Sequence, residues 1–163
     1  MPEKYSFKDY DKHLSLKVCP ELWLAILYFL HPYLLLLSSF RSINPDAAAL
    51  KSMIYPDDFS LAVAILATTP ALCFIYAWTR RSPGGSSLVK YIWRNGSMFL
   101  SLAALFNIAT VLVPLLAGAG HKIHIVGWAQ LGISVVIIVY VQFSQRVKDT
   151  FADFPDEKGG EHT

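Results

Sequence analysis

Charged residues are scarce in this sequence. Asp, Glu, Lys and Arg make up 16% of the 163 residues, whereas about a quarter of the residues in an ordinary soluble domain are charged. The scarcity is also uneven, because four long stretches contain no charged residue at all, namely residues 22–40, 59–79, 95–120 and 123–145. Helices of soluble proteins carry a polar face, so this pattern excludes an ordinary soluble domain.

Cysteine is nearly absent, with only Cys19 and Cys73 in the chain. Two cysteines are too few for a disulfide framework, and no CxxC or Cys/His spacing indicates zinc. Cys73 lies inside an uncharged stretch, where we interpret it as a small buried hydrophobe. We also expect no cleavable signal peptide, since about 20 polar and charged residues precede the first apolar stretch.

The uncharged stretches have the length of membrane spans. A helix needs about 20 mostly apolar residues to cross about 30 Å of hydrocarbon, and lipid requires the backbone groups to pair within the segment. The sequence therefore predicts an all-α polytopic membrane protein with four transmembrane helices, over about residues 22–40, 59–79, 96–117 and 123–144. This divides the chain into an interfacial N-terminal segment (1–21), a four-helix transmembrane domain (22–145) and a tail (146–163).

The basic residues indicate the orientation. Positive charge accumulates in short cytoplasmic loops. Of the 14 Lys and Arg residues, 11 lie in the N-terminal segment, in the loop between the second and third spans, or in the tail, and only Arg41, Lys51 and Lys122 lie on the other side. We therefore predict that both termini are cytoplasmic (N-in/C-in).

Three segments outside the spans have recognisable patterns. Asn44 is a good helix cap and Pro45 suits a first helical turn, so residues 45–55 predict a short helix on the outer surface. Residues 88–95 interleave aromatic and basic side chains, which is typical of an interfacial helix held by anionic lipid. In the tail, Phe151, Phe154 and Pro155 form an apolar cluster. The cluster either docks on the bundle, which we favour, or serves as a hook for a partner, and we expect the last eight residues to be disordered.

Polar residues at the centres of the spans are the candidate functional residues, because ionisable groups inside a membrane are costly. His31 is central in the first span, Thr69 in the second and Asn107 in the third, while Gln130 lies one turn from the centre of the fourth. In a simple bundle these four residues lie at similar depth. They act either as hydrogen-bonding contacts between helices, which we favour, or as a ligand or proton site, since His titrates near neutrality. A neutral His31 bonded to Asn107 is one such contact.

Three prolines interrupt the spans: Pro32, Pro70 and Pro114. Each one removes the hydrogen bond to the carbonyl four residues earlier. Broken helices mark binding sites in some transporters, but proline is also common in transmembrane helices that have no such role. The structural interpretation is favoured, and the prolines remain candidate helix breaks.

The spans also lack the groups that several activities need. No Asp or Glu lies within them, which disfavours a proton-coupled exporter and leaves His31 without an acid for hydrolase chemistry. His121 and His124 are too near the outer surface to pair with His31 as haem ligands. We therefore expect no catalytic residue, no metal and no cofactor, and the two basic residues of the interfacial segment are too few for nucleic acid.

Several short motifs follow one another along the chain, at residues 10–11, 16–17, 22–24, 32–33, 55–57, 70–71 and 146–155. Their order resembles that of the YfeZ-like family of uncharacterised bacterial inner-membrane proteins. The resemblance covers nearly the whole chain, from about Tyr10 to Pro155. It implies a multi-pass protein of the bacterial inner membrane, and it supplies no activity, cofactor or site.

Two functions remain open from the sequence. The first is a non-enzymatic accessory or assembly partner of a membrane complex, indicated by the missing chemistry and by aromatic-rich, uncharged faces. The alternative is a small transporter or channel-like carrier that uses the central polar residues and the proline breaks. The expected partners are the lipid bilayer and either another protein or a second copy of the chain.

Overall fold

The structure is a computed structural model that describes residues 5–11, 15–40, 49, 51–52, 54–55, 58–116 and 125–155. Its four long helices are α1 (Pro20–Phe40), α3 (Asp58–Thr79), α5 (Gly96–Leu116) and α6 (Ile125–Phe143). Two short helices, α4 (Ser87–Arg94) and α7 (Gln145–Ala152), and one 3-10 turn, η1 (Phe7–Asp9), complete the described elements. The described residues contain no strand beyond a single bridge between Tyr10 and Leu16, so the predicted all-α fold is confirmed.

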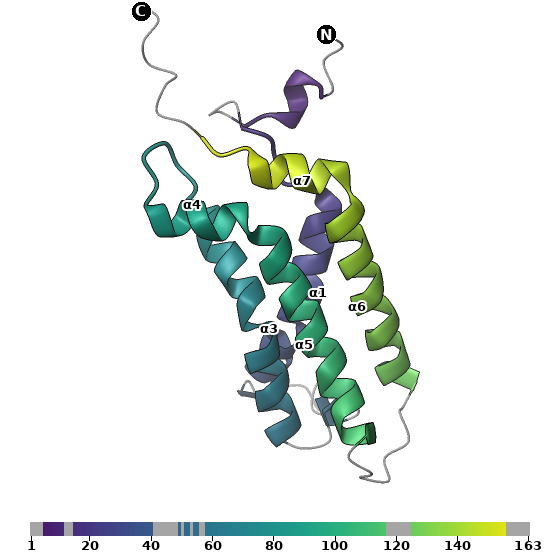
Figure 1. The fold of residues 1–163 in the computed structure, drawn as a ribbon. Helices are drawn as coiled ribbons and strands as arrows, with labels where there is room; N and C mark the ends of the chain where they lie inside the picture. The colour runs from purple at the N-terminus through teal and green to yellow at the C-terminus, as the bar shows by residue number, and fades with distance from the viewer. Residues whose placement is uncertain are drawn as a thin grey trace, which may run out of the picture.

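The four long helices lie side by side, and α4 and α7 lie across one end of them (Figure 1). The first and last described segments, residues 5–11 and 145–155, lie at that same end (Figure 1). We call it the capped end, and it comprises α4, α7, residues 80–86 and the described parts of residues 5–19. Within the bundle, α5 packs against both α3 and α6, and α1 packs against α3.

All four long helices are long and apolar enough to cross a membrane. They occupy the four uncharged stretches, because a segment without charged side chains gains most from a lipid surrounding when its backbone groups bond internally. The first helix begins at Pro20, slightly before its stretch, since proline suits a first helical turn. The helices continue through Pro32 and Pro70. Most of the predicted outer helix over residues 45–55, and the last eight residues, lie outside the described residues.

Helix α4 matches the segment whose aromatic and basic residues predict a helix. The Ser86 side chain accepts a hydrogen bond from the Val89 backbone N–H, which caps the helix start. Val89, Ile92 and Trp93 are buried, whereas Leu88 and Tyr91 are exposed. Residues three and four apart share one face of a helix, so α4 places one apolar face on the bundle and leaves another uncovered.

Helix α7 was not predicted from the sequence, although the docking of the tail was favoured. Val147, Thr150 and Phe151 are buried on one face of it, and Phe154 is buried just beyond its end. The Phe151 ring meets the rings of Phe74 and Trp93 at centroid distances of 5.6 and 5.5 Å. Burial of each large apolar side chain contributes about 1.5–3 kcal/mol in water. This aromatic group therefore fastens the tail to α3 and α4.

Close approach of α7 to the bundle requires a glycine. A Cβ atom at Gly96, the first residue of α5, would place three carbon atoms of the Phe151 ring within 2.7 Å of it. That distance is far inside van der Waals contact, so residue 96 needs to be glycine for Phe151 to occupy its position. The glycine at the start of α5 thereby leaves room for the Phe151 side chain of α7.

Candidate functional site

His31 is held by two hydrogen bonds, and the first of them follows from the proline after it. Pro32 has no N–H, so the Tyr28 carbonyl loses its normal helical donor. The His31 Nδ1 atom takes that place and hydrogen-bonds the Tyr28 carbonyl oxygen. An Nδ1–H that donates leaves Nε2 as the acceptor of the neutral ring. The Tyr55 hydroxyl lies 2.7 Å from Nε2 and donates to it, and the two rings stack with their centroids 6.0 Å apart.

The Tyr28 side chain connects three helices. Its hydroxyl lies 3.1 Å from the Asn107 Oδ1 atom of α5, and 3.2 and 3.3 Å from the Gln130 carbonyl and the Ser134 hydroxyl of α6. The Ser134 hydroxyl also donates to Asn107 Oδ1 over 3.1 Å. Asn107 and Ser134 are buried. These residues form a hydrogen-bonded group between α1, α5 and α6, which we call the polar cluster (Tyr28, Asn107, Gln130 and Ser134).

One side of the Asn107 amide has no partner. Its Nδ2 atom is buried and makes no hydrogen bond among the residues that the structure describes. A buried donor without an acceptor costs about 1–3 kcal/mol, and a site of this kind accepts water or the oxygen of a ligand. The polar cluster therefore fixes the positions of three helices and retains two unused N–H donors.

Of the four sequence candidates, the structure brings two into the polar cluster. Asn107 contributes its side-chain oxygen and Gln130 its backbone carbonyl. His31 lies beside the cluster and contacts Tyr28 and Tyr55, so the expected bond from His31 to Asn107 is replaced by these two contacts.

Thr69 lies apart from the polar cluster. Its side chain is exposed and its hydroxyl bonds the Ile65 carbonyl of its own helix at 3.1 Å, with the Tyr33 hydroxyl 3.4 Å away. The preceding residue, Thr68, is the one that is fully buried. Successive residues of a helix point about 100° apart, so the two threonines share one depth and face different directions. The expectation that Thr69 joins the central group is therefore not met.

Two tyrosines of the site were not identified from the sequence. Tyr28 lies three residues before His31 on the same helix face, and this spacing was the available signal. Tyr55 comes from the segment between α1 and α3, and no sequence spacing connects it to His31. The candidate break Pro114 lies within α5, and Pro32 has the defined local effect described above.

The capped end contains a second polar network, centred on Arg81. The guanidinium group donates to the Leu16 carbonyl at 3.1 Å and to the Asp153 carbonyl at 3.0 Å, and it lies 4.3 Å above the Trp93 ring. The Trp93 indole N–H lies 3.1 Å from the Thr150 carbonyl and 2.9 Å from the Asp153 carbonyl. Arg81 is partly buried, and this burial lowers the pKa of its guanidinium. The loop after α3 thus connects the N-terminal segment at Leu16 with the segment after α7 at Asp153.

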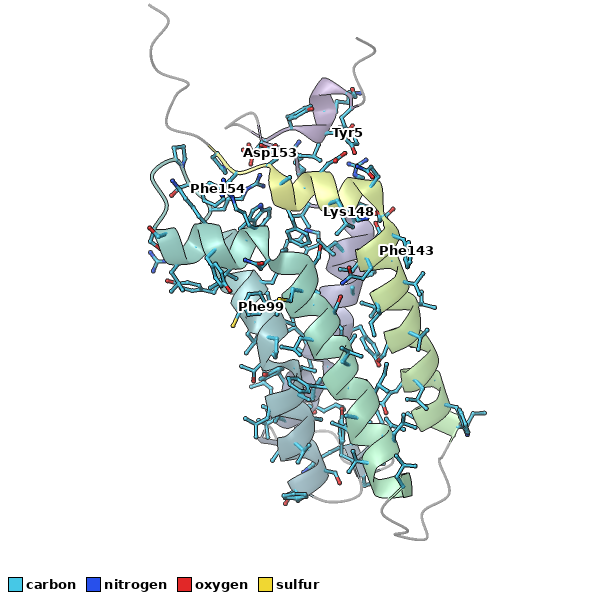
Figure 2. The ribbon with its side chains drawn as sticks, viewed as in Figure 1. Tyr5, Phe99, Phe143, Lys148, Asp153 and Phe154 are labelled. Carbon is cyan, nitrogen blue, oxygen red and sulfur yellow. The ribbon has the colours of Figure 1, made fainter. Side chains whose placement is uncertain are left out.

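The N-terminal segment is attached to α7 and its end by charged side chains. The Asp153 carboxylate accepts from the Leu16 backbone N–H at 2.6 Å. Arg146 pairs with Asp9 at 2.9 Å, and this hydrogen bond holds the pKa of the Asp9 carboxyl below its ordinary value and raises that of Arg146. Figure 2 shows Tyr5 beside α7 and Asp153 with Phe154 at its far end. Charge-assisted bonds of this kind are among the stronger hydrogen bonds of proteins.

The described side chains offer no metal centre. No group of three or more His, Cys, Asp or Glu side chains within the described part of the chain is placed to hold a metal ion. The polar cluster consists of hydroxyl and amide groups, which position helices and bind polar ligands by hydrogen bonds. The capped end consists of bonds from side chains to backbone carbonyls, which hold separate segments in one arrangement.

These features define a protein whose described residues form four helices long and apolar enough to cross a membrane, with α4, α7 and the described part of the N-terminal segment at one end of them. The chain belongs to the DUF2919 family, described as a protein of unknown function, whose model matches residues 5–153. The matched region includes the polar cluster and the capped end from Tyr5 to Asp153. No curated protein and no solved structure matches the chain.

Proposed function

We propose that this protein is a non-enzymatic accessory or assembly partner of a membrane complex, and that it acts by association through its capped end. We propose that it lies in the bacterial inner membrane, as the family resemblance implies, with both termini in the cytoplasm, as the distribution of Lys and Arg residues favours. The observation that carries the proposal is the construction of the capped end, where four separate segments are joined by side-chain contacts to backbone carbonyls.

The contacts at the capped end are more elaborate than four membrane spans require. Arg81 and Trp93 each contact two carbonyl groups, and Asp153 joins the N-terminal segment to the tail. A surface that is already ordered loses less conformational entropy on binding. Beside this network, Leu88 and Tyr91 of α4 are 59% and 61% exposed. An ordered polar surface next to exposed apolar side chains is suited to contact with another protein.

The test is purification of the tagged protein at its native level in mild detergent, followed by mass spectrometry of the intact complex. We expect a defined partner in fixed stoichiometry. We expect binding of that partner to be lost when residues 150–163 are deleted, and to be weakened by the substitution Asp153→Ala. The matched control is Thr69→Ala, which changes an exposed side chain on α3 away from the capped end and should retain the partner. Recovery of the wild-type protein only as a monomer or a homodimer overturns the proposal.

A second function, a small carrier, is favoured by one specific observation: the buried Asn107 Nδ2 atom makes no hydrogen bond among the described residues. It lies in the polar cluster, and His31 and Tyr55 extend the polar groups from the cluster toward the segment before α3. The test is proton flux in liposomes that contain a pH-sensitive dye. A carrier shows flux above empty liposomes that is lost in both Asn107→Leu and His31→Leu and retained in Thr69→Ala. Flux equal to that of empty liposomes excludes the movement of protons.

A further inference from the structure

A hollow of about 430 Å³ lies where α4, α5 and α7 meet at the capped end. It is lined by Arg94 at the end of α4, by Ser97 in the first turn of α5, and by Lys148, Phe151 and Ala152 of α7. Figure 2 shows Lys148 on α7, near the bend where α6 ends and α7 begins. Two basic side chains from different elements therefore converge on one concave surface with an aromatic floor.

The basic residues of the hollow, Arg94 and Lys148, form no ion pair within the described part of the chain. The nearest acidic residues of α7 and its end have other partners, since Asp149 accepts from Tyr5 at 2.6 Å and Asp153 accepts from the Leu16 N–H. Two cations and one hydroxyl at a concave surface attract an anion. Arg and Lys are the side chains that bind phosphate most often, Arg through its planar fork and Lys as a point charge.

The position of the hollow selects the source of that anion. The apolar window of α5 begins at Gly96 and that of α6 ends at Phe143. The hydrocarbon core is about 30 Å thick within a bilayer of about 40–45 Å, so residues just outside these limits lie at the level of the lipid headgroups. Met98 of α5 and Phe143 at the end of α6 are 63% and 79% exposed. They suit contact with acyl chains, while the basic residues lie at the depth of a lipid phosphate.

We propose that the hollow formed by Arg94, Ser97 and Lys148 binds the phosphate group of an anionic phospholipid. The two cations neutralise the phosphate, the Ser97 hydroxyl donates a hydrogen bond to it, and the acyl chains run along the outer faces of α5 and α6. The site is independent of the protein partner proposed above. It gives the capped end a fixed depth and a preference for anionic lipid.

The experiment compares lipid binding by the full-length protein in nanodiscs of phosphatidylglycerol and of phosphatidylcholine, with bound lipid counted by native mass spectrometry after release. The test variant is Arg94→Gln with Lys148→Gln. Its control is Lys8→Gln with Arg80→Gln, which removes the same charge from exposed residues of the capped end outside the hollow. We expect the test variant, which lacks both charges of the hollow, to retain phosphatidylglycerol about 30-fold less well than the wild type, and the control to retain it better than the test variant.

A second measurement on the wild-type protein does not depend on the folding of a variant. An amine-reactive reagent should label Lys148 more slowly in phosphatidylglycerol than in phosphatidylcholine nanodiscs, while labelling of Lys8 changes less. Equal labelling of Lys148 in both lipids, or equal lipid retention by the two double variants, overturns the proposal. Protection of Lys148 by inorganic phosphate alone, to the degree given by phosphatidylglycerol, assigns the hollow to a free phosphate and also overturns the lipid assignment.

Discussion

Substitution of Gly96 by alanine tests how the tail is fastened to the bundle. The new Cβ atom would lie within 2.7 Å of three Phe151 ring carbons. The ring has little freedom to move away, because Phe74 and Trp93 pack against it. Overpacking of a filled core costs about 1–3 kcal/mol, and because Gly96 is the first residue of α5, the preference for alanine over glycine in helix interiors offsets little of this cost. We therefore expect Gly96→Ala to destabilise the docked state of α7 by about 1–3 kcal/mol.

Amide hydrogen exchange of α7 in nanodiscs measures this change. Local opening sets the exchange rate of docked segments, and a change of about 1–3 kcal/mol corresponds to about 5- to 150-fold faster exchange. The matched control is Gly132→Ala in α6, where an added Cβ meets nothing within 4 Å. In this control we expect the amides of α7 to exchange no faster than in the wild type. In the double variant Gly96→Ala with Phe151→Leu, α7 should exchange no faster than in Phe151→Leu alone. Unchanged exchange in Gly96→Ala, or additive effects in the double variant, would refute the reasoning.

Three further predictions concern single contacts. Arg146 lowers the pKa of Asp9 in the folded protein, so the stabilisation from this pair is complete above the unfolded pKa of about 3.8 and is lost as the pH falls through the lower folded pKa. Acid should therefore release the N-terminal segment, which hydrogen exchange would detect, and the Asp9→Asn variant should show no such step. Tyr28→Phe should lower the stability of the bundle by about 1 kcal/mol in denaturing detergent, whereas Tyr76→Phe, at an exposed position, should leave it unchanged. Trp93→Phe keeps a ring but removes two hydrogen bonds, so limited proteolysis should cleave the tail faster, consistent with about 1–2 kcal/mol of lost docking energy.

The four long helices were predictable because each one coincides with a long stretch of the sequence that has almost no charged residues. A helix is the structure in which a segment of this length pairs its backbone groups within itself in lipid, so the prediction depended on one strong constraint. Helix α7 follows a weaker signal. Val147, Thr150 and Phe151 have helical spacing, but the surrounding polar residues hid this short amphipathic pattern within what was interpreted as a tail. Docking of Phe151 and Phe154 was favoured on their apolar character alone.

The sequence predicted at what level along the helices the central polar residues lie, but not which neighbouring helix each side chain faces. Counting along the helices placed His31, Thr69 and Asn107 at one level, but the rotation of each helix decides which side chain faces its neighbours. Thr68 faces inward and Thr69 outward, and the count along the chain does not distinguish them. Tyr28 was treated as part of an apolar span, although its hydroxyl is the group that joins three helices. The contacts of Arg81 and Asp153 depend on tertiary structure, which no local pattern reports.

Site-specific photo-crosslinking in intact cells tests most directly whether the protein acts by association through its capped end. A photo-reactive residue is placed at the exposed positions Leu88 and Tyr91 of α4, and for comparison at Leu66 of α3 and Val136 of α6, which are exposed along the spans. We expect one defined protein adduct from the α4 positions, and we expect it to be absent from the Leu66 and Val136 positions. Absence of any protein adduct at the α4 positions, or the same adducts at all four, would contradict it.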